Sequence, residues 1–223
     1  NVVSIGNSAF QNASITSCTI GANVTSIGRS AFRECSSLGS ITIPISVTSI
    51  GDSAFRGCTI LGSITFEETS VTSIGTDTFR DCTGLTSIAI PASVTTIKGS
   101  AFRGCSSLGS VTFQGTSLTS IGSNAFNGCT SLDSIIIPDS VTSIENGTFY
   151  GCTSLGSITI PASVTSIGNY AFWGCTILGS ITIPAGVTSI GNYAFSGCTG
   201  LATVLFLGNL PTTIGTDAFS GIA

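Results

Sequence analysis

The sequence has no histidine and no methionine, and only 7% of its 223 residues are charged. An ordinary soluble domain carries roughly 25% charged residues. Without histidine, a Ser-His-Asp triad, a Cys-His pair and imidazole metal ligands are all excluded. Six Lys and Arg against ten Asp and Glu give a net charge of −4, which argues against binding to nucleic acid. No apolar run approaches the length that spans a bilayer, so we expect no membrane insertion.

The remaining chemistry-bearing residues do not form an enzyme motif. The carboxylates are scattered along the chain, apart from the adjacent pair Glu67 and Glu68, and neighbours in sequence rarely converge as an acid and a base. The glycines occur at regular intervals and match no P-loop or dinucleotide fingerprint. We therefore predict a protein that is not an enzyme and that uses no metal and no cofactor.

What the sequence does contain is one repeat, copied along its whole length. The pentad Val-Thr-Ser-Ile-Gly and its near-copies recur every 22 to 24 residues. The copies begin at Val2, Val24, Val47, Val71, Val94, Leu118, Val141, Val164, Val187 and Pro211. They leave no room for a linker, so residues 1–223 are predicted to form a single solenoid domain.

Each copy has the pattern of one solenoid coil. In the second copy, residues 38–43 alternate like a strand, residues 47–50 form a second short extended piece, and residues 54–58 allow at most one turn of helix. A period near 23 residues falls in the leucine-rich-repeat range. We predict a mostly β fold with short helical turns: a right-handed solenoid of about ten 23-residue coils, carrying a long parallel sheet. At about 4.8 Å per coil, the rod would be roughly 48 Å long.

Two apolar columns of the repeat are predicted to form the core, because only stacking can bury them. Phenylalanine fills one column in all ten copies: Phe10, Phe32, Phe55, Phe79, Phe102, Phe126, Phe149, Phe172, Phe195 and Phe219. Leucine fills the other in the eight copies from Leu38 to Leu201. Three further phenylalanines, Phe66, Phe113 and Phe206, replace the strand-end isoleucine in copies that are 24 residues long, so we expect a repacked corner there.

The pattern L-x-x-I-x-I-P-x-x-V-x-x-I-G-x-x-A-F-x-x-C resembles the BspA-like leucine-rich repeat, also called the Treponema pallidum type, over essentially the whole chain. The resemblance implies a surface or secreted protein of a bacterium or protist, and a role in adhesion to proteins or in coaggregation. It implies an architecture and names no ligand.

The nine cysteines have a structural interpretation. Eight occupy one column of the repeat, and Cys18 lies elsewhere in the first copy. Parallel side chains about 4.8 Å apart do not converge as a disulfide or a metal cluster requires. We predict a ladder of buried free thiols that pack as small apolar side chains.

One column carries a mixture of side chains that suggests a binding surface. It directly follows the ladder phenylalanine and reads Gln11, Arg33, Arg56, Arg80, Arg103, Asn127, Tyr150, Trp173, Ser196 and Ser220. Tyr170 and Tyr193 lie three residues before two of these positions and are expected near the same edge. Arginine binds carboxylates and sulfates, and Tyr, Trp and Arg are enriched in interface hot spots. The candidate partner-binding residues are therefore Arg33, Arg56, Arg80, Arg103, Tyr150, Tyr170, Trp173 and Tyr193.

A structural explanation of the same column stays open. Duplication could have copied arginine with its neighbours, and nearby acids could neutralise it in exposed pairs worth under about 1 kcal/mol each. The acids in question are Glu34, Asp52, Asp77 and Asp81. All six basic residues lie in residues 1–103, whose charge balance is zero, whereas the remaining residues carry four acids and no base.

The strand face suggests an alternative function. Ser40, Thr42 and Pro44 are predicted to point out of the sheet, and threonine recurs in a second column from Thr25 to Thr212. Such flat hydroxyl ladders resemble those of ice-binding solenoids, although threonine is also simply a good residue for exposed strands. We therefore predict a non-enzymatic extracellular or cell-surface module that binds a protein or glycan, with an ice-binding or structural rod as the alternative.

The ends and the glycosylation sequons lead to three smaller expectations. Neither terminal copy has the polar cap that a solenoid needs, so we expect either a longer parent chain or end-to-end association of two copies. The sequons at Asn12, Asn23 and Asn146 would matter only for a eukaryotic secretory source.

Overall fold

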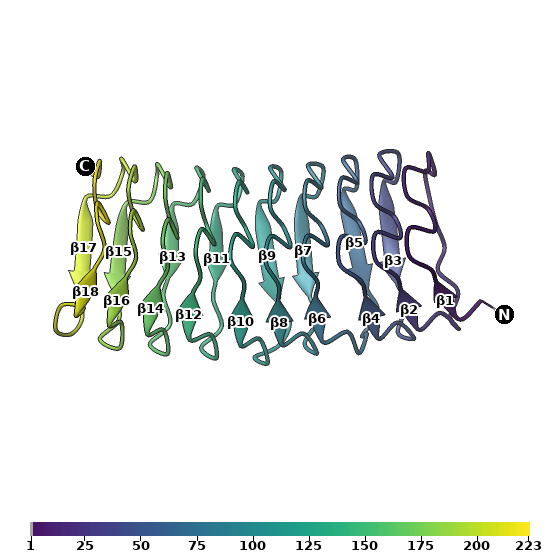
Figure 1. Ribbon diagram of the computed structural model, residues 1–223, viewed down its shortest axis with the longest axis horizontal. Helices are drawn as coiled ribbons and strands as arrows, with labels where there is room; N and C mark the ends of the chain where they lie inside the picture. Colours follow the sequence, from purple (N-terminus) through teal and green to yellow (C-terminus); the bar gives the residue numbers. More distant parts are fainter. Residues whose placement is uncertain (1) are drawn as a thin grey trace.

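The computed structural model describes residues 2–223 and forms an elongated stack of coils with its termini at opposite ends (Figure 1). Each coil contributes a short strand, and eight coils also contribute a longer one. The short strands are β1 (Ser4–Ile5), β2 (Ser26–Ile27), β4 (Ser49–Ile50), β6 (Ser73–Ile74), β8 (Thr96–Ile97), β10 (Ser120–Ile121), β12 (Ser143–Ile144), β14 (Ser166–Ile167), β16 (Ser189–Ile190) and β18 (Thr213–Ile214). The longer strands are β3 (Ser40–Ile43), β5 (Ser63–Phe66), β7 (Ser87–Ile90), β9 (Ser110–Phe113), β11 (Ser134–Ile136), β13 (Ser157–Thr159), β15 (Ser180–Ile183) and β17 (Thr203–Phe206).

All strand pairs are parallel and join equivalent positions of neighbouring coils, as in the pairing of Ser40 with Ser63. The solenoid predicted from the repeat is therefore confirmed. The sheet is not continuous, however. The short strands form three ladders, β1-β2-β4, β6-β8-β10 and β12-β14-β16-β18, and the longer ones pair as β3-β5, β7-β9, β11-β13 and β15-β17. Two of the interruptions, between β5 and β7 and between β9 and β11, coincide with coils that are one residue longer.

The expected turns of helix are tight turns instead, and residues 2–223 contain no helix. In the third coil the N–H of Arg56 donates to the carbonyl of Ser53 at 3.1 Å, and the N–H of Cys58 donates to that of Phe55 at 3.2 Å. Ser53 and Gly57 have φ of 58° and 72°, which is left-handed backbone. A helix cannot continue through such residues, so each turn closes after one hydrogen bond.

The prediction that Pro44 points out of the sheet is wrong. Ser40 and Thr42 of β3 are exposed as predicted, but Pro44, just beyond the strand, is buried. The alternation of a strand ends at Ile43, and the chain turns there, with the N–H of Val47 donating to the carbonyl of Pro44. The turn directs the proline ring toward the core.

The phenylalanine ladder runs through the core along the length of the rod, beside the buried leucine and cysteine columns. Its ten rings stack face to face with centroids 5.0 to 5.7 Å apart. The eight inner rings are fully buried, and Phe10 and Phe219 at the ends are half-buried. The strand-end Phe113 is also half-buried, and it lines a surface hollow of about 600 Å³ together with Pro138 and the exposed Ile136. The longer coils therefore do have an altered corner.

The cysteine ladder is confirmed as a set of buried free thiols. All nine cysteines are free, and eight are buried. Each ladder thiol donates to the carbonyl of a ladder phenylalanine in the preceding coil, for example Cys58 to Phe32 at 3.1 Å and Cys105 to Phe79 at 3.0 Å. The thiols therefore have both an apolar environment and a hydrogen-bond acceptor.

This arrangement predicts a simple thiol titration. In the native protein we expect one thiol to react rapidly with an aromatic disulfide reagent, because only Cys18 is more than slightly exposed among the cysteines. In denaturant we expect nine thiols per chain. A count below seven in denaturant would mean that cross-links exist and would contradict the ladder.

Candidate functional site

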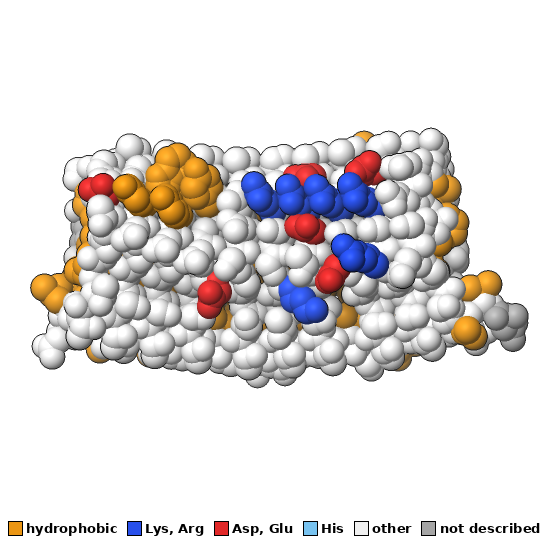
Figure 2. Space-filling view, viewed as in Figure 1, with side chains coloured by type: hydrophobic (Ala, Val, Ile, Leu, Met, Phe, Trp, Pro, Cys, Tyr) orange, Lys and Arg blue, Asp and Glu red, His pale blue; other side chains and the backbone are white. Residues whose placement is uncertain are grey.

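The column after the ladder phenylalanine is held in line by backbone hydrogen bonds. From Arg33 to Ser220, each carbonyl of this column accepts an N–H from the preceding coil. For example, the N–H of Glu34 donates to the carbonyl of Arg56 at 2.7 Å, and the N–H of Asp81 donates to that of Arg103 at 2.7 Å. Because each ladder ring points into the core, the next side chain points to solvent. The four arginines of this column therefore lie in consecutive coils on one face; we call Arg33, Arg56, Arg80 and Arg103 the Arg row. Figure 2 shows a line of basic side chains on this face.

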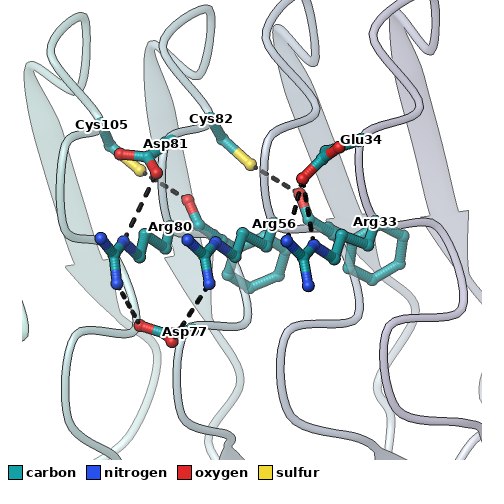
Figure 3. Close-up of polar contacts among 10 residues, drawn as sticks. Arg33, Glu34, Arg56, Asp77, Arg80, Asp81, Cys82 and Cys105 are labelled. Atoms are coloured by element: carbon teal, nitrogen blue, oxygen red, sulfur yellow. Dashed lines mark hydrogen bonds and ion pairs between the residues drawn. The ribbon is translucent and has the colours of Figure 1, made fainter. Parts of the chain in front are cut away.

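Acidic neighbours compensate most of the charge of the Arg row (Figure 3). Arg33 pairs with Glu34 at 3.1 Å. The carboxylate of Asp77 lies between two arginines, 3.6 Å from Arg80 and 3.9 Å from Arg56. Asp81 lies 3.4 Å from Arg80. These are partly exposed pairs, each worth about 1 kcal/mol or less, so the row presents alternating charges to solvent.

Two details differ from the expected neutralisation of the row. Asp52 does not pair with an arginine; its carboxylate accepts the N–H of Thr76 at 2.8 Å. Arg103 is exposed and forms no ion pair with any residue between 2 and 223. The basic end of the row toward the centre of the rod is therefore open to an external acceptor.

Farther along the same face the aromatic side chains form two stacked pairs. Tyr150 and Trp173 have ring centroids 4.5 Å apart, and Tyr170 and Tyr193 have centroids 5.1 Å apart. The N–H of Trp173 donates to the carbonyl of Tyr170, which places the two pairs side by side. We call these four residues the aromatic cluster; Figure 2 shows an apolar group in line with the basic side chains. Trp173 and Tyr170 are 37% and 42% exposed.

The backbone under two of these tyrosines is unfavourable. Tyr170 and Tyr193 both have φ of 56°, in a column whose other members are Ser, Asp, Asn or Gly. A bulky residue in left-handed backbone costs roughly 1–2 kcal/mol, whereas Gly, Asn and Asp adopt it more readily. One aromatic pair contributes about 0.5–1.5 kcal/mol, so stacking alone does not offset the strain at both positions.

All eight residues predicted from the sequence thus lie on one face, in two groups separated by Asn127. Sequence reasoning missed Asp217. It occupies the same left-handed column as Asp77, one coil beyond Tyr193, with φ of 53°. Only the contacts of Asp77 with its neighbouring arginines show which side chains a carboxylate in this column can reach. The sequence alone therefore contains no signal that Asp217 lies beside the aromatic cluster.

The threonine columns use their hydroxyl groups within the rod. The hydroxyl of Thr48 donates to the carbonyl of Thr25 at 3.2 Å, and that of Thr188 donates to Thr165 at 3.2 Å. The same bond recurs in other coils, at Thr25, Thr95, Thr119, Thr165 and Thr212. These hydroxyls stabilise the contact between coils, which accounts for the column without an external ligand.

Comparison with known proteins gives the family and the fold. The sequence profile of the BspA type Leucine rich repeat region matches residues 3–133 and 119–223. A leucine-rich repeat protein from Bacteroides ovatus is similar in structure, with 28% identity, a TM-score of 0.53, and coverage of 99% of this chain and 80% of that one. One from Eubacterium ventriosum has 25% identity and a TM-score of 0.51, covering 89% and 62% of the two chains.

The pneumococcal vaccine antigen PcpA shares the fold, with a TM-score of 0.58 at 20% identity, covering 96% of this chain and 71% of that one. A search of curated proteins found no match. Between residues 2 and 223, no helix has the length and apolar character to cross a bilayer. The fold is of a kind that typically serves as a binding scaffold without catalytic activity. With its ten repeats and the profile match along its length, the chain belongs to the BspA-type leucine-rich repeat family.

Proposed function

We propose that this protein is an extracellular or cell-surface adhesion module, and that it binds a partner protein through the Arg row and the aromatic cluster. The observation that carries the proposal is the alignment of these two groups on one face of a rigid rod. The eight side chains come from seven of eight consecutive coils, the coil of Asn127 contributing none, so they span about 34 Å at the usual strand spacing. That length is sufficient for a standard protein interface of about 800 Å² per partner.

The charge of the row favours a protein partner over a sulfated glycan. A polyanionic glycan is bound best by a surface of strong net positive charge. Here Glu34, Asp77 and Asp81 balance most of the row, and the chain as a whole carries −4. A surface that combines ion-paired arginines with exposed Tyr and Trp side chains is typical of protein interfaces, where these residues supply the hot spots.

A selection from a random peptide library tests this function while the partner itself is unidentified. The immobilised protein should enrich a defined peptide family. The double substitution Arg56→Ala and Arg80→Ala should weaken binding of the selected peptides about tenfold or more, because hot-spot truncations exceed roughly 2 kcal/mol. Binding should also weaken as salt concentration rises. Affinity is measured by fluorescence anisotropy of the labelled peptides.

The matched control replaces exposed threonines of another column, Thr48→Ala and Thr188→Ala, and should leave peptide affinity unchanged. Peptides that bind the double-arginine variant and the wild type equally would place the binding surface elsewhere. A selection that enriches no peptide family would contradict the proposed protein-binding function.

A further inference from the structure

The Arg row contains its own example of how this scaffold seats a guanidinium group. Asp77 lies in the left-handed column, and its carboxylate contacts Arg80 of its own coil and Arg56 of the preceding coil. Figure 3 shows Asp77 between these two parallel guanidinium groups. A carboxylate at this position therefore serves two guanidinium positions in the neighbouring column.

Asp217 repeats the position of Asp77 at the other end of the rod. The N–H of Tyr193 donates to Thr216 as that of Ser53 donates to Thr76, and the N–H of Ser220 donates to Asp217 as that of Arg80 donates to Asp77. The φ values of the two aspartates are 53° and 54°. By this register, Asp217 faces the column at Ser220 and Ser196, which are the counterparts of Arg80 and Arg56.

The two serines leave the space of an arginine side chain beside that carboxylate. Ser220 donates its hydroxyl to Ser196 at 2.9 Å, and both are small. No basic residue follows Arg103 in the sequence, and Asp217 forms no ion pair within residues 2–223. Asp217 is exposed, and none of the described residues supplies a cation to its carboxylate.

The aromatic cluster forms the wall of the same space. One face of Trp173 is covered by Tyr150, and Ser196 follows Trp173 in the next coil, its carbonyl accepting the N–H of Gly174 at 2.9 Å. Because serine is small, the other face of the indole is not covered by a ring. A cation at the position of Ser196 would stand about 4.8 Å from that face, which is within the distance of about 6 Å for a cation–π contact.

We propose that Trp173, Ser196 and Asp217 form a seat for the guanidinium group of an arginine side chain from the partner protein. The planar group would stack on the indole and pair with the carboxylate of Asp217, as Arg56 pairs with Asp77. Tyr193, which lies in the same coil as Ser196 and has left-handed backbone, flanks the seat. The seat rests on the proposed function, and it specifies what the partner presents at the aromatic end: an arginine.

The only tryptophan of the chain is Trp173, so its fluorescence reports directly on the seat. The probes are the blocked tripeptide Gly-Arg-Gly and the same peptide with citrulline, which has the shape of arginine without its charge, titrated at low ionic strength. We expect a saturable change of Trp173 emission with the arginine peptide, and at least about tenfold weaker binding with the citrulline peptide.

Two substitutions separate the seat from general surface charge. Asp217→Asn keeps the shape and suits left-handed backbone, and it should lower the affinity for the arginine peptide about tenfold. Asp139→Asn, an exposed acid of the same half outside this column, is the matched control and should change nothing. Ser196→Arg should place a guanidinium group of the protein itself in the seat. We expect this variant to show shifted Trp173 emission in the absence of peptide and no change of emission when the arginine peptide is added. Thermal melts by circular dichroism confirm that each variant is folded.

Equal titrations with the arginine and citrulline peptides, or an unchanged affinity of Asp217→Asn, would overturn the seat. The result is distinct from a failure of the proposed function. If the peptide library yields binders that depend on the Arg row while the arginine tripeptide has no effect, the seat alone is wrong. The opposite result is that the library enriches no peptide family, whereas the arginine tripeptide does bind. In that case the seat is correct and the protein-binding role is wrong.

Discussion

Replacing Phe102 with alanine is expected to lower the free energy of unfolding by about 3–5 kcal/mol. The ring is fully buried and stacks on Phe79 at 5.4 Å and on Phe126 at 5.3 Å. In a solenoid, each coil is stabilised mainly by its two neighbours. The cavity at Phe102 therefore weakens the contact between the two halves of the rod, and urea unfolding should change from one transition to two.

Two probes distinguish these transitions. Trp173 fluorescence reports the eighth coil, and circular dichroism reports the whole rod, so their urea midpoints should coincide in the wild type and separate in Phe102→Ala. The matched control is Phe10→Ala, at the half-buried end of the ladder with one stacking neighbour. Phe10→Ala should lower the free energy of unfolding clearly less than Phe102→Ala does. The urea midpoints measured by fluorescence and by circular dichroism should still coincide in this variant. Equal losses for both variants would mean that the ladder is not the continuous core of the rod.

The sequence was sufficient to predict the coil and its core, because a fixed repeat length gives every column the same environment. If Phe102 points into the core, the nine other phenylalanines of its column must do the same. The same reasoning applies to the leucine column and to the cysteine column. The errors occur where a coil departs from regular strand geometry. Pro44 follows the last strand residue, so strand alternation no longer predicts its direction. The turn predicted as helical at residues 54–58 is bounded by left-handed backbone at Ser53 and contains it at Gly57, and no pattern of apolar residues reveals backbone of that kind.

At the candidate site, too, the sequence predicts which residues share a column but does not predict their individual contacts. That the arginines share one column follows from spacing alone, and the structure confirms their alignment. The partners of each arginine depend on side-chain reach, which spacing does not specify: Asp77 bridges two arginines, whereas Asp52 caps a backbone N–H instead. Asp217 has no arginine beside it, so nothing in the sequence distinguishes it from any other surface acid. Its significance follows from the geometry of Asp77.

Raising the pH above 9 is expected to destabilise the protein steeply, because the cysteine ladder must stay protonated. Burial is the main cause that raises the pKa of Cys58, Cys105 and Cys152 from 9.0 to about 12. Below pH 9 these thiols are protonated in both the folded and the unfolded chain, so they contribute no pH dependence. Between pH 9 and pH 12 the unfolded chain releases protons that the folded chain retains. Stability therefore falls as pH rises, by about 4 kcal/mol per pH unit for the three thiols together.

Urea midpoints of the reduced protein between pH 8 and pH 11 measure this slope. The matched variant carries alanine at Cys58, Cys105 and Cys152. Alanine is suitable because the first coil already has alanine, Ala13, at this position of the repeat. The lost thiol contacts should lower stability by a similar amount at every pH, so the comparison rests on the slope alone. We expect the variant to lose about 4 kcal/mol less per pH unit above pH 9. Burial also raises the pKa of Cys82 and Cys129, so a residual slope should persist in the variant. Identical slopes in the two proteins would mean that the ladder thiols do not control the alkaline limit of the fold.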